Sequence, residues 1–332
     1  MQVTALWALA LNCAEASLQE ELWLRVGDDF WQAVGDHQDA KKDIMAIMAA
    51  DMEVTAIREA AELPCGTAWA DRLEAFDRVW REDMLVELHD EAGVTGRRLA
   101  IAAAALSNTK LSVVKRGLRS RVVQPTSGLV EGRRHSPLQF CISANPIQRA
   151  FERGYIGIGL NPPAEAVAEF LRAQDGTADA RYDLTTATKL LQLQRTGQAT
   201  WEEVMARAHN DTTRLVILDL ASSLRAGQRM FVDDVRCRIA GHGHATHVMG
   251  IMDAVSRDLR FRYRTGCGKT EITAAGFDSA SPIAIRDGLV EYVDRHTGLG
   301  IADTDRPLGA GHLGKIMRLS QSCFIDDGNH RH

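Results

Sequence analysis

The chain of 332 residues lacks three features that would define its class at once: paired cysteines, a strong excess of one charge and a long apolar run. Its six cysteines are scattered without C-x-x-C spacing, which excludes a zinc ribbon and a disulfide-dense scaffold and fits a reducing compartment. The net charge of −5 provides no overall attraction for nucleic acid or an anionic membrane. No uninterrupted apolar stretch reaches membrane-spanning length. We therefore expect no nucleic-acid partner and no membrane span.

The N-terminus lacks the basic residues that normally open a signal peptide. Residues 3–11 form a short apolar run, and residues 14–16 read Ala-Glu-Ala, which has the A-x-A spacing of a cleavage site. However, no Lys or Arg precedes the run. We expect a plain N-terminal helix and a cytoplasmic protein, with secretion through residues 1–16 as the alternative.

The composition that is present fits an ordinary globular protein, with 45% hydrophobic and 25% charged residues. A chain of this length usually divides into two domains. We expect residues 1–135 to be helical, because apolar side chains recur there at helical spacing in two stretches. The first stretch has Ile44, Ile47, Met48 and Ile57, and the second has Trp69, Leu73, Phe76, Trp80 and Leu88, followed by Gly93.

The composition changes between Lys110 and Arg134. Seven basic residues in this segment face a single acid, Glu131, and Pro125, Gly128 and Gly132 interrupt it. Such a segment is expected to be a solvated linker or surface element, and contact with phosphate or an acidic partner is the alternative. We place a domain boundary near residue 135.

Residues 136–332 combine helix signals with a series of strand-like runs. Asp183 is placed to cap a helix over residues 185–194, and Thr200 with Glu203 forms a capping box for the next helix. Strand-like runs follow at 214–220, 229–239, 246–252 and 259–264, and Pro282 is placed to open a last helix that ends near His296. Short loops between the runs favour antiparallel pairing. We expect an α+β fold, with a helical N-terminal region followed by an antiparallel-sheet domain with flanking helices.

Three histidines lie within six residues, at His242, His244 and His247, ahead of an apolar run that ends at Asp253. A neutral imidazole is the commonest metal ligand, and its unperturbed pKa lies near physiological pH. The cluster is therefore the best candidate for a chemical centre. The alternative is a loop whose histidines only form hydrogen bonds.

Residues 182–252 resemble the papain-like pattern of NlpC/P60 proteins and bacterial transglutaminases. In those families a helix opens with Asp-Cys, a turn places a glycine before an apolar strand, and the next strand begins with the catalytic histidine. Here Asp183-Leu184, Gly227 and His247 follow in that order. The resemblance implies a papain-like fold, with His247 as general base for hydrolysis or transfer at an amide or acyl bond of a protein or peptide-like substrate. Because Leu184 replaces the nucleophile, either another cysteine serves or the site is degenerate.

Cys237 is the nearest substitute for that nucleophile. If the runs around Cys237 and His247 form a hairpin, the two residues become cross-strand neighbours with Cβ atoms about 5 Å apart. A register slip of one residue turns Cys237 to the other face. Cys13 is a more distant alternative, and Asp253 or Asp183 is expected to orient His247 or to hold charge near it.

The spacing His242-x-His244-x-x-His247 also resembles the metallo-β-lactamase motif H-x-H-x-D-H, with Thr246 in the aspartate position. Three protein ligands suffice for a zinc ion that keeps a water, and the ion lowers the pKa of that water to about 7. This resemblance implies a metal-dependent hydrolase with zinc as cofactor and His242, His244 and His247 as ligands. Further ligands are expected among His296, His312, Asp253, Asp303 and Asp305.

Two further interpretations stay open. Residues 265–270 contain a Gly-Lys-Thr triplet of the kind that binds phosphates, but Tyr263 stands where a complete P-loop needs glycine. A non-catalytic binding or interaction protein is the second, because Leu184 cannot act as a nucleophile. Tyr182 and the arginines of the run 259–264 would then line a groove for an acidic or carboxylate-bearing ligand.

Overall fold

A computed structural model describes residues 32–33, 44–107, 109–129, 136–176, 181–231, 234–266, 269–275, 281–293, 295–298 and 301–304. The helices are α2 (Ile44–Ala60), α3 (Arg81–Asp90), α4 (Gly96–Ser107), α5 (Ser136–Gly154), α6 (Ala164–Ala173), α7 (Leu184–Arg195), α8 (Trp201–Arg207), α9 (Asp211–Ala221) and α10 (His242–Asp258). The strands are β1 (Gln32–Ala33), β2 (Cys65–Ala70), β3 (Val114–Lys115), β4 (Leu118–Arg119), β5 (Ile158–Gly159), β6 (Arg225–Ala226), β7 (Gln228–Phe231), β8 (Asp234–Ile239), β9 (Glu271–Ala275), β10 (Ile283–Ile285), β11 (Gly288–Val293), β12 (Arg295–Gly298) and β13 (Ile301–Thr304).

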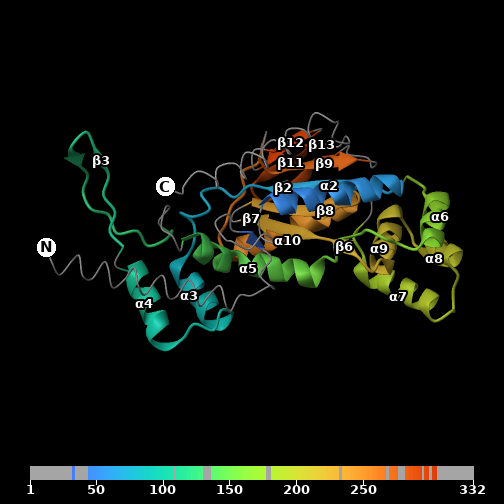
Figure 1. Ribbon diagram of the computed structural model, residues 1–332, viewed down its shortest axis with the longest axis horizontal. Coiled ribbons are helices and arrows are strands. Elements are labelled where there is room, and N and C mark those ends of the chain that lie inside the picture. The colour runs from blue at the N-terminus through green and yellow to red at the C-terminus, as the bar shows by residue number, and fades with distance from the viewer. Residues whose placement is uncertain are drawn as a thin grey trace, which may run out of the picture.

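A mixed sheet lies at the centre of the molecule (Figure 1). Its described strands follow the order β1-β7-β8-β2-β9-β11-β10, and neighbours are antiparallel except for the parallel pairs β1–β7 and β9–β11. Strand β2 lies between β8 and β9, so Ala68 is opposite Cys237 on one side and Ile272 on the other. The expected α+β class is confirmed, but the sheet is mixed rather than antiparallel. It joins strands from both sides of residue 135.

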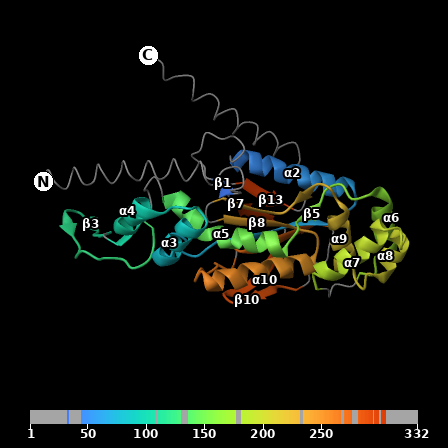
Figure 2. The same ribbon diagram turned by 90° about the horizontal axis from the view of Figure 1, so that it is seen from below.

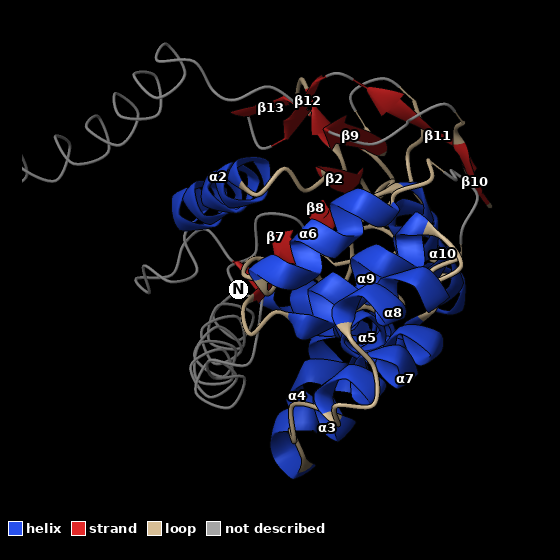
Figure 3. Cartoon of the chain, turned by 90° about the vertical axis from the view of Figure 1, so that its right-hand side faces the viewer, coloured by secondary structure: helices blue, strands red, loops and turns tan. Residues whose placement is uncertain are grey.

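Helices cover both faces of this sheet (Figures 2 and 3). Helix α2 packs on one face, and α5 and α10 pack together on the other. Helices α6 to α9 form a group at one end of the molecule, whereas α3 and α4 lie at the opposite end. Within the described ranges, no helix has the length and apolar character needed to cross a membrane.

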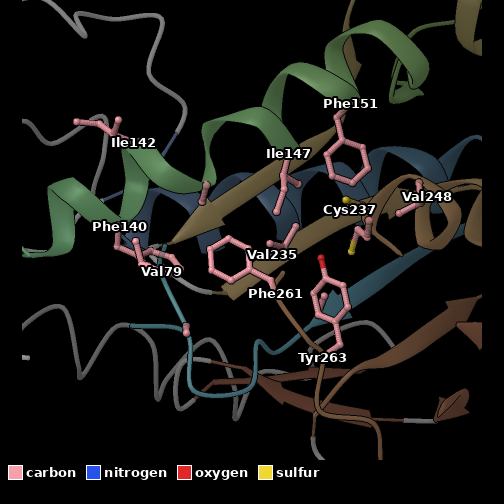
Figure 4. Packing of buried hydrophobic residues seen from close by; sticks show 14 of the residues in the cluster. Val79, Phe140, Ile142, Ile147, Phe151, Val235, Cys237, Val248, Phe261 and Tyr263 are labelled. Carbon is pink, nitrogen blue, oxygen red and sulfur yellow. The ribbon is translucent and has the colours of Figure 1, made fainter. Parts of the chain in front are cut away.

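Strand β8 explains why the two faces of the sheet differ. Its side chains alternate between the faces, and the apolar ones enter the core beneath α5 and α10 (Figure 4). The opposite face carries Arg236 and Arg238, both buried. Asp51 of α2 forms an ion pair with Arg236, while Arg238 donates to the hydroxyls of Thr55 and Thr67. Charge is tolerated inside because each guanidinium meets acceptors from α2 or from the neighbouring strand.

Arg58 and Asp219 join α2 to the group of helices at the far end. Both side chains are completely buried, and Nη1 of Arg58 lies 3.2 Å from Oδ1 of Asp219. Arg58 also donates to the carbonyl oxygens of Pro64 and Gly159. A buried ion pair is stable only with such additional bonds, and removing one partner typically costs about 3–5 kcal/mol. A second apolar cluster, drawn largely from α6 to α9, packs beside this pair.

Residues 109–126, which we call the arm, form a two-stranded hairpin that extends away from α3 and α4 (Figures 1 and 2). Arg116 and Gly117 close the hairpin with φ angles of 50° and 80°, the two positive values that a type I′ turn requires. The basic segment expected as a linker or surface element is therefore, over these residues, an exposed hairpin.

Local capping signals predict their helices correctly. Asp183 caps α7 by accepting a hydrogen bond from the backbone N–H of Thr186. Thr200 and Glu203 form the expected capping box at the start of α8. Each of these signals depends on residues three positions apart, so distant packing does not alter it.

The predictions made from apolar runs are wrong where the helical spacing of apolar and polar residues is not visible in the sequence. The helix expected over residues 69–88 is instead the end of β2, a loop and the shorter helix α3. The strands expected over residues 214–220 and 246–252 lie in the helices α9 and α10. Helix α9 is buried on most sides, so apolar residues surround it and no clear helical stripe is visible in the sequence. Helix α10 has an exposed face, but within residues 246–252 that face carries only Thr246 and Gly250, so no charged stripe marks it.

Three further boundaries are corrected by turns. The run 229–239 divides between β7 and β8, which form a hairpin. The run 259–264 contains no extended strand, only an isolated bridge from Tyr263 to Arg72. The helix expected from Pro282 is the hairpin of β10 and β11. Arg286 and Asp287 form the turn there, and the sequence Asp287-Gly288 is a stronger local signal for a hairpin than the proline is for a helix.

Candidate functional site

The histidine cluster lies on helix α10 rather than on a hairpin. A helix turns about 100° per residue, so His242 and His244 point to nearly opposite sides, whereas His244 and His247 share a side. Nδ1 of His242 lies 2.7 Å from the hydroxyl of Tyr292 on β11. The Nε2–H of His247 donates to the carbonyl oxygen of Gly154 at 2.7 Å.

The three imidazoles therefore do not converge on one point. In the part of the chain that the structure describes, no group of three or more His, Cys, Asp and Glu side chains is placed to hold a metal ion. Of the further ligands expected, His312 and Asp305 lie outside the described residues, and only the backbone is described at His296 and Asp303. The zinc site stays a prediction.

Cys237 lies in the middle of β8 without exposed surface. Its strand pairs with β2 and β7, so the expected hairpin with the segment of His247 is wrong, because that segment is helical. The thiol packs in the apolar core with Phe151 and Val248 (Figure 4), and burial raises its pKa well above the ordinary value. A buried neutral thiol is a poor nucleophile. Cys13, the alternative, lies outside the described residues.

Asp183 and Asp253 are engaged in structural contacts. The hydroxyl of Thr186 donates to Asp183 at 2.6 Å and its backbone N–H donates at 2.9 Å, and these bonds lower the pKa of Asp183. Asp253 accepts from Arg257 at 3.1 Å and from the backbone N–H of Arg286 at 3.2 Å. In the described structure neither carboxylate is hydrogen-bonded to a histidine of α10.

Two tyrosines and two histidines form an aromatic cluster, which consists of Tyr155, Tyr182, His244 and His247. The ring of Tyr182 stacks on His247 with centroids 4.3 Å apart and planes at 13°, and it meets His244 edge-on at 5.0 Å. Tyr155 packs against Tyr182 with centroids 5.6 Å apart. The segment that opens α7 thus reaches α10 through Tyr182, the residue that precedes the cap.

His244 and Asp219 form a buried pair next to the aromatic cluster. Nδ1 of His244 lies 3.9 Å from Oδ2 of Asp219, which is too far for a hydrogen bond, and neither atom has a partner among the described residues. Burial, and then the nearby Arg58 guanidinium, lower the pKa of His244 to about 3. Burial raises the pKa of Asp219 to about 6, although Arg58 acts in the opposite direction. The imidazole is neutral near pH 7, so this contact is not an ion pair.

A cavity of about 370 Å³ lies beside the aromatic cluster. Its walls come from the end of α5 and from the segment that joins β6 to β7: Gln148, Glu152, Tyr155, Ile156, Arg225, Ala226, Gly227 and Gln228. The volume falls at the lower end of the range of about 300–1,000 Å³ that is typical of small-molecule sites. Tyr155 belongs to both the cavity wall and the aromatic cluster, and its hydroxyl donates to the carbonyl oxygen of Arg238.

The cavity presents opposite charges and an unused acceptor. Glu152 and Arg225 are exposed, and neither forms an ion pair with another described residue. Gln148 is buried, and its Nε2 donates to Glu152 at 3.2 Å. Because the atom that donates to Glu152 must be the amide nitrogen, the second atom of the amide group is the oxygen Oε1. This oxygen has no hydrogen-bond partner among the described residues. We take this cavity, with the aromatic cluster behind it, as the candidate functional site.

Other residues singled out from the sequence are engaged elsewhere. Nζ of Lys269 lies 3.0 Å from Asp71, so this ammonium is paired with a carboxylate of the chain. Arg262 pairs with Asp287 at 2.9 Å, and Arg260 stacks over a tryptophan ring at 3.7 Å from its centroid. The two residues between Gly266 and Lys269 in the glycine-rich turn lie outside the described residues.

Comparison with known proteins adds no family: no protein-family model and no curated protein sequence matches the chain. Chemistry and geometry alone therefore support any functional conclusion.

Most of the cavity is not apparent from the sequence. The signal that points to it is the closely spaced glycines at 154, 157 and 159, which flank Tyr155. Gly157 has a φ of 78°, and an added Cβ would lie 2.5 Å from the carbonyl oxygen of Ala226 in the cavity wall. The backbone therefore approaches β6 more closely than any other residue type allows.

Proposed function

We propose that the protein binds a small zwitterionic ligand, such as an amino acid or a dipeptide, in the cavity beside Tyr155. The observation that carries this proposal is the pairing of one carboxylate, Glu152, with one guanidinium, Arg225, on the walls of the same cavity. Arg225 acts electrostatically on the buried Asp219 and lowers its pKa, but neither Arg225 nor Glu152 forms an ion pair with another described residue. A ligand with one ammonium and one carboxylate satisfies both charges at once.

Each contact has a defined chemical role. A guanidinium binds a carboxylate through two parallel hydrogen bonds, which gives Arg225 the orienting role. Glu152 accepts from the ammonium of the ligand. The Oε1 atom of Gln148 is a further acceptor for an N–H of the ligand, since its own amide group is already bonded to Glu152. The cavity volume of about 370 Å³ suits a ligand of this size.

Isothermal titration calorimetry with glycylglycine, its N-acetyl derivative and its C-terminal amide tests the proposal. We expect glycylglycine to bind, and each blocked derivative to lose about tenfold or more in affinity, because a charge-assisted bond contributes about 1.5–3 kcal/mol. Arg225→Gln should weaken the parent dipeptide but leave the C-terminal amide unchanged. Glu152→Gln should likewise weaken the parent dipeptide but leave the affinity for the N-acetyl derivative unchanged.

Two neighbouring arginines provide matched controls. Arg153 follows Glu152 on α5 and Arg207 lies on α8, both are exposed, and neither lines the cavity. Arg153→Gln and Arg207→Gln should leave the affinity unchanged. If no zwitterion binds, or if binding is equally strong in Glu152→Gln and Arg225→Gln, the proposal is wrong.

Hydrolysis or transfer at an amide or acyl bond is the second candidate, and the stacking of Tyr182 on His247 beside the cavity favours it. His247 would act as the base, but no accessible nucleophile accompanies it, since Cys237 is buried. Proton NMR of glycylglycine incubated with the protein separates the two candidates. Free glycine whose release is abolished by His247→Gln would indicate catalysis, whereas an intact dipeptide leaves binding alone.

A further inference from the structure

The arm has the composition of a contact surface. It contains five basic residues and no acidic one, and six of its apolar side chains are exposed: Leu111, Val113, Val114, Leu118, Val122 and Val123. The exposed fraction reaches 70% at Val113 and 78% at Leu118. An isolated two-stranded hairpin is at best marginally stable in water, and exposed apolar groups of this size usually mark an interaction site.

The register of the hairpin separates these side chains into two faces. Lys115 is paired with Leu118, and Val114 is paired with Arg119, so successive residues alternate between the faces. Val113 and Leu111 fall on the face of Leu118, because they lie two and four residues before Lys115. This face therefore carries apolar side chains together with Lys115. The other carries Val114, Arg119 and, by alternation along the first strand, Lys110.

The base of the arm is held firmly, so its projection is a built feature of the fold. The buried Arg81 of α3 donates to the carbonyl oxygens of Leu106, Pro125 and Gly128, which flank the two ends of the arm. The backbone N–H of Gly128 also donates to the carbonyl oxygen of Val79. These bonds fix where the chain leaves and rejoins the body.

A complementary surface lies beside that base, on α3. Glu82, Asp83, Val86 and Asp90 are exposed there, and Val86 has an exposed fraction of 55%. Residues 82, 86 and 90 are four apart, so they form one stripe along the helix with Asp83 next to it. The stripe thus has an exposed apolar side chain between carboxylates. We call it the acidic stripe.

We propose that the arm of one copy of this chain docks on the acidic stripe of a second copy, and that the second arm docks reciprocally. Both features are needed by this partner: Lys115 faces the carboxylates of the acidic stripe, and the apolar side chains on the same face of the arm lie against Val86. Pairing of arm with arm is disfavoured, because five positive charges would face five others. Since each arm leaves the body beside α3, one two-fold axis brings both contacts together.

Nucleic acid and anionic membranes fit the arm less well. The arm has no aromatic residue to stack on a base or to lie at a membrane interface. Phosphate contacts would use the basic side chains but leave the exposed apolar side chains of the arm in water. A second copy of the chain accounts for both kinds of side chain.

Analytical ultracentrifugation of the full chain with charge-reversed variants tests the proposal. We expect a dimer at about 0.1 M salt that dissociates more readily at about 1 M, as the Debye length falls from about 10 Å to about 3 Å. The arm variant Lys115→Glu/Arg119→Glu and the stripe variant Glu82→Lys/Asp83→Lys should each be monomeric alone. An equimolar mixture of the two should regain the dimer, because both reciprocal contacts then pair opposite charges.

Two controls separate docking from misfolding. All four positions are exposed, so circular dichroism of each variant should match the unchanged chain. Arg207→Glu, an exposed reversal on α8, should dimerise like the unchanged chain. A chain that is monomeric at every concentration, or a mixture of variants that stays monomeric, overturns the proposal. A monomer whose arm binds duplex DNA or anionic vesicles would also overturn it.

Discussion

His244 shows at the scale of a single residue how this protein carries polar groups in its interior. The imidazole is completely buried, and neither ring nitrogen forms a hydrogen bond of ordinary geometry with a described residue, although the backbone of Thr212 acts to raise the pKa of His244. Such a group costs about 1–3 kcal/mol relative to a satisfied one. Arg58, Asp219 and Arg238, in contrast, are buried with several partners each. His244 is thus the buried polar side chain whose replacement is expected to increase stability.

Replacing His244 with phenylalanine should stabilise the protein increasingly as the pH falls below about 6.5. The folded protein keeps His244 neutral because its pKa is lowered to about 3, whereas the unfolded chain takes up the proton near 6.5. This difference destabilises the unchanged protein by at most about 1.4 kcal/mol per pH unit between these values. The phenylalanine variant lacks the effect. Urea unfolding at several pH values measures the difference between the two proteins.

The titration of Asp219 does not change the expected difference in stability between the two proteins. Its raised pKa of about 6 acts in the opposite direction, since stability is lost as the pH rises from 3.8 to about 6, but both proteins share it. The exposed His209→Phe serves as the control for the loss of an imidazole outside the aromatic cluster. A constant difference for His244→Phe would mean that His244 takes up its proton at the same pH in the folded and the unfolded protein, and would contradict the prediction.

The elements of the fold were predictable from the sequence to the extent that their signals are local. Asp183 and Thr200 identified the starts of α7 and α8, because capping involves only neighbouring residues. Strands are predicted in place of α9 and α10, because α9 is buried on most sides and the exposed face of α10 carries only small residues, Thr246 and Gly250, within the predicted run. The predicted helix that begins at Trp69 includes the end of β2, since all six residues of that strand are buried and no alternation with polar residues is visible.

The candidate site was predictable only in part. The sequence indicates His244, His247 and Tyr182. For the two histidines it predicts a shared hairpin or a shared metal ion, and the structure places both histidines on a helix. Asp219 and Tyr155 were not found, since their contacts join segments far apart in the sequence. Hydrophobic periodicity within one segment carries no information about such contacts.

Glycine at position 157 should be essential for the segment that lines the cavity. Gly157 and Gly197 both have positive φ angles, 78° and 70°, so alanine strains the backbone by about 1–2 kcal/mol at either position. Only at Gly157 would the new Cβ meet another atom, the carbonyl oxygen of Ala226 at 2.5 Å. Gly157→Ala should therefore cost about 1–3 kcal/mol more than Gly197→Ala in the free energy of unfolding.

Chemical denaturation of both glycine variants, together with the dipeptide titration, checks this expectation. Gly197→Ala, at the end of α7, has open space around the added Cβ and should bind ligand normally. Gly157→Ala should lose affinity because β5 and β6 move apart. Equal stability of the two variants would show that the close approach at Ala226 is relaxed without cost.

The whole molecule depends on one strand from its first half. Because β2 pairs with both β8 and β9, a fragment of residues 136–332 lacks the strand between them and exposes two long edges. We expect this fragment to be insoluble or unfolded, as measured by circular dichroism and by the dispersion of its amide NMR signals. A fragment that unfolds cooperatively on its own would show that residues 136–332 are an independent domain.

The position of β2 also has a consequence during synthesis. Residues 65–70 leave the ribosome long before residues 271–275, with which they must pair. At about 5–20 residues per second, that interval is roughly 10–40 s, during which the apolar side chains of β2 have neither neighbouring strand. The nascent chain must therefore keep this segment from aggregating until its C-terminal third emerges. Translation speed and access to chaperones, more than final stability, should limit the yield of folded protein.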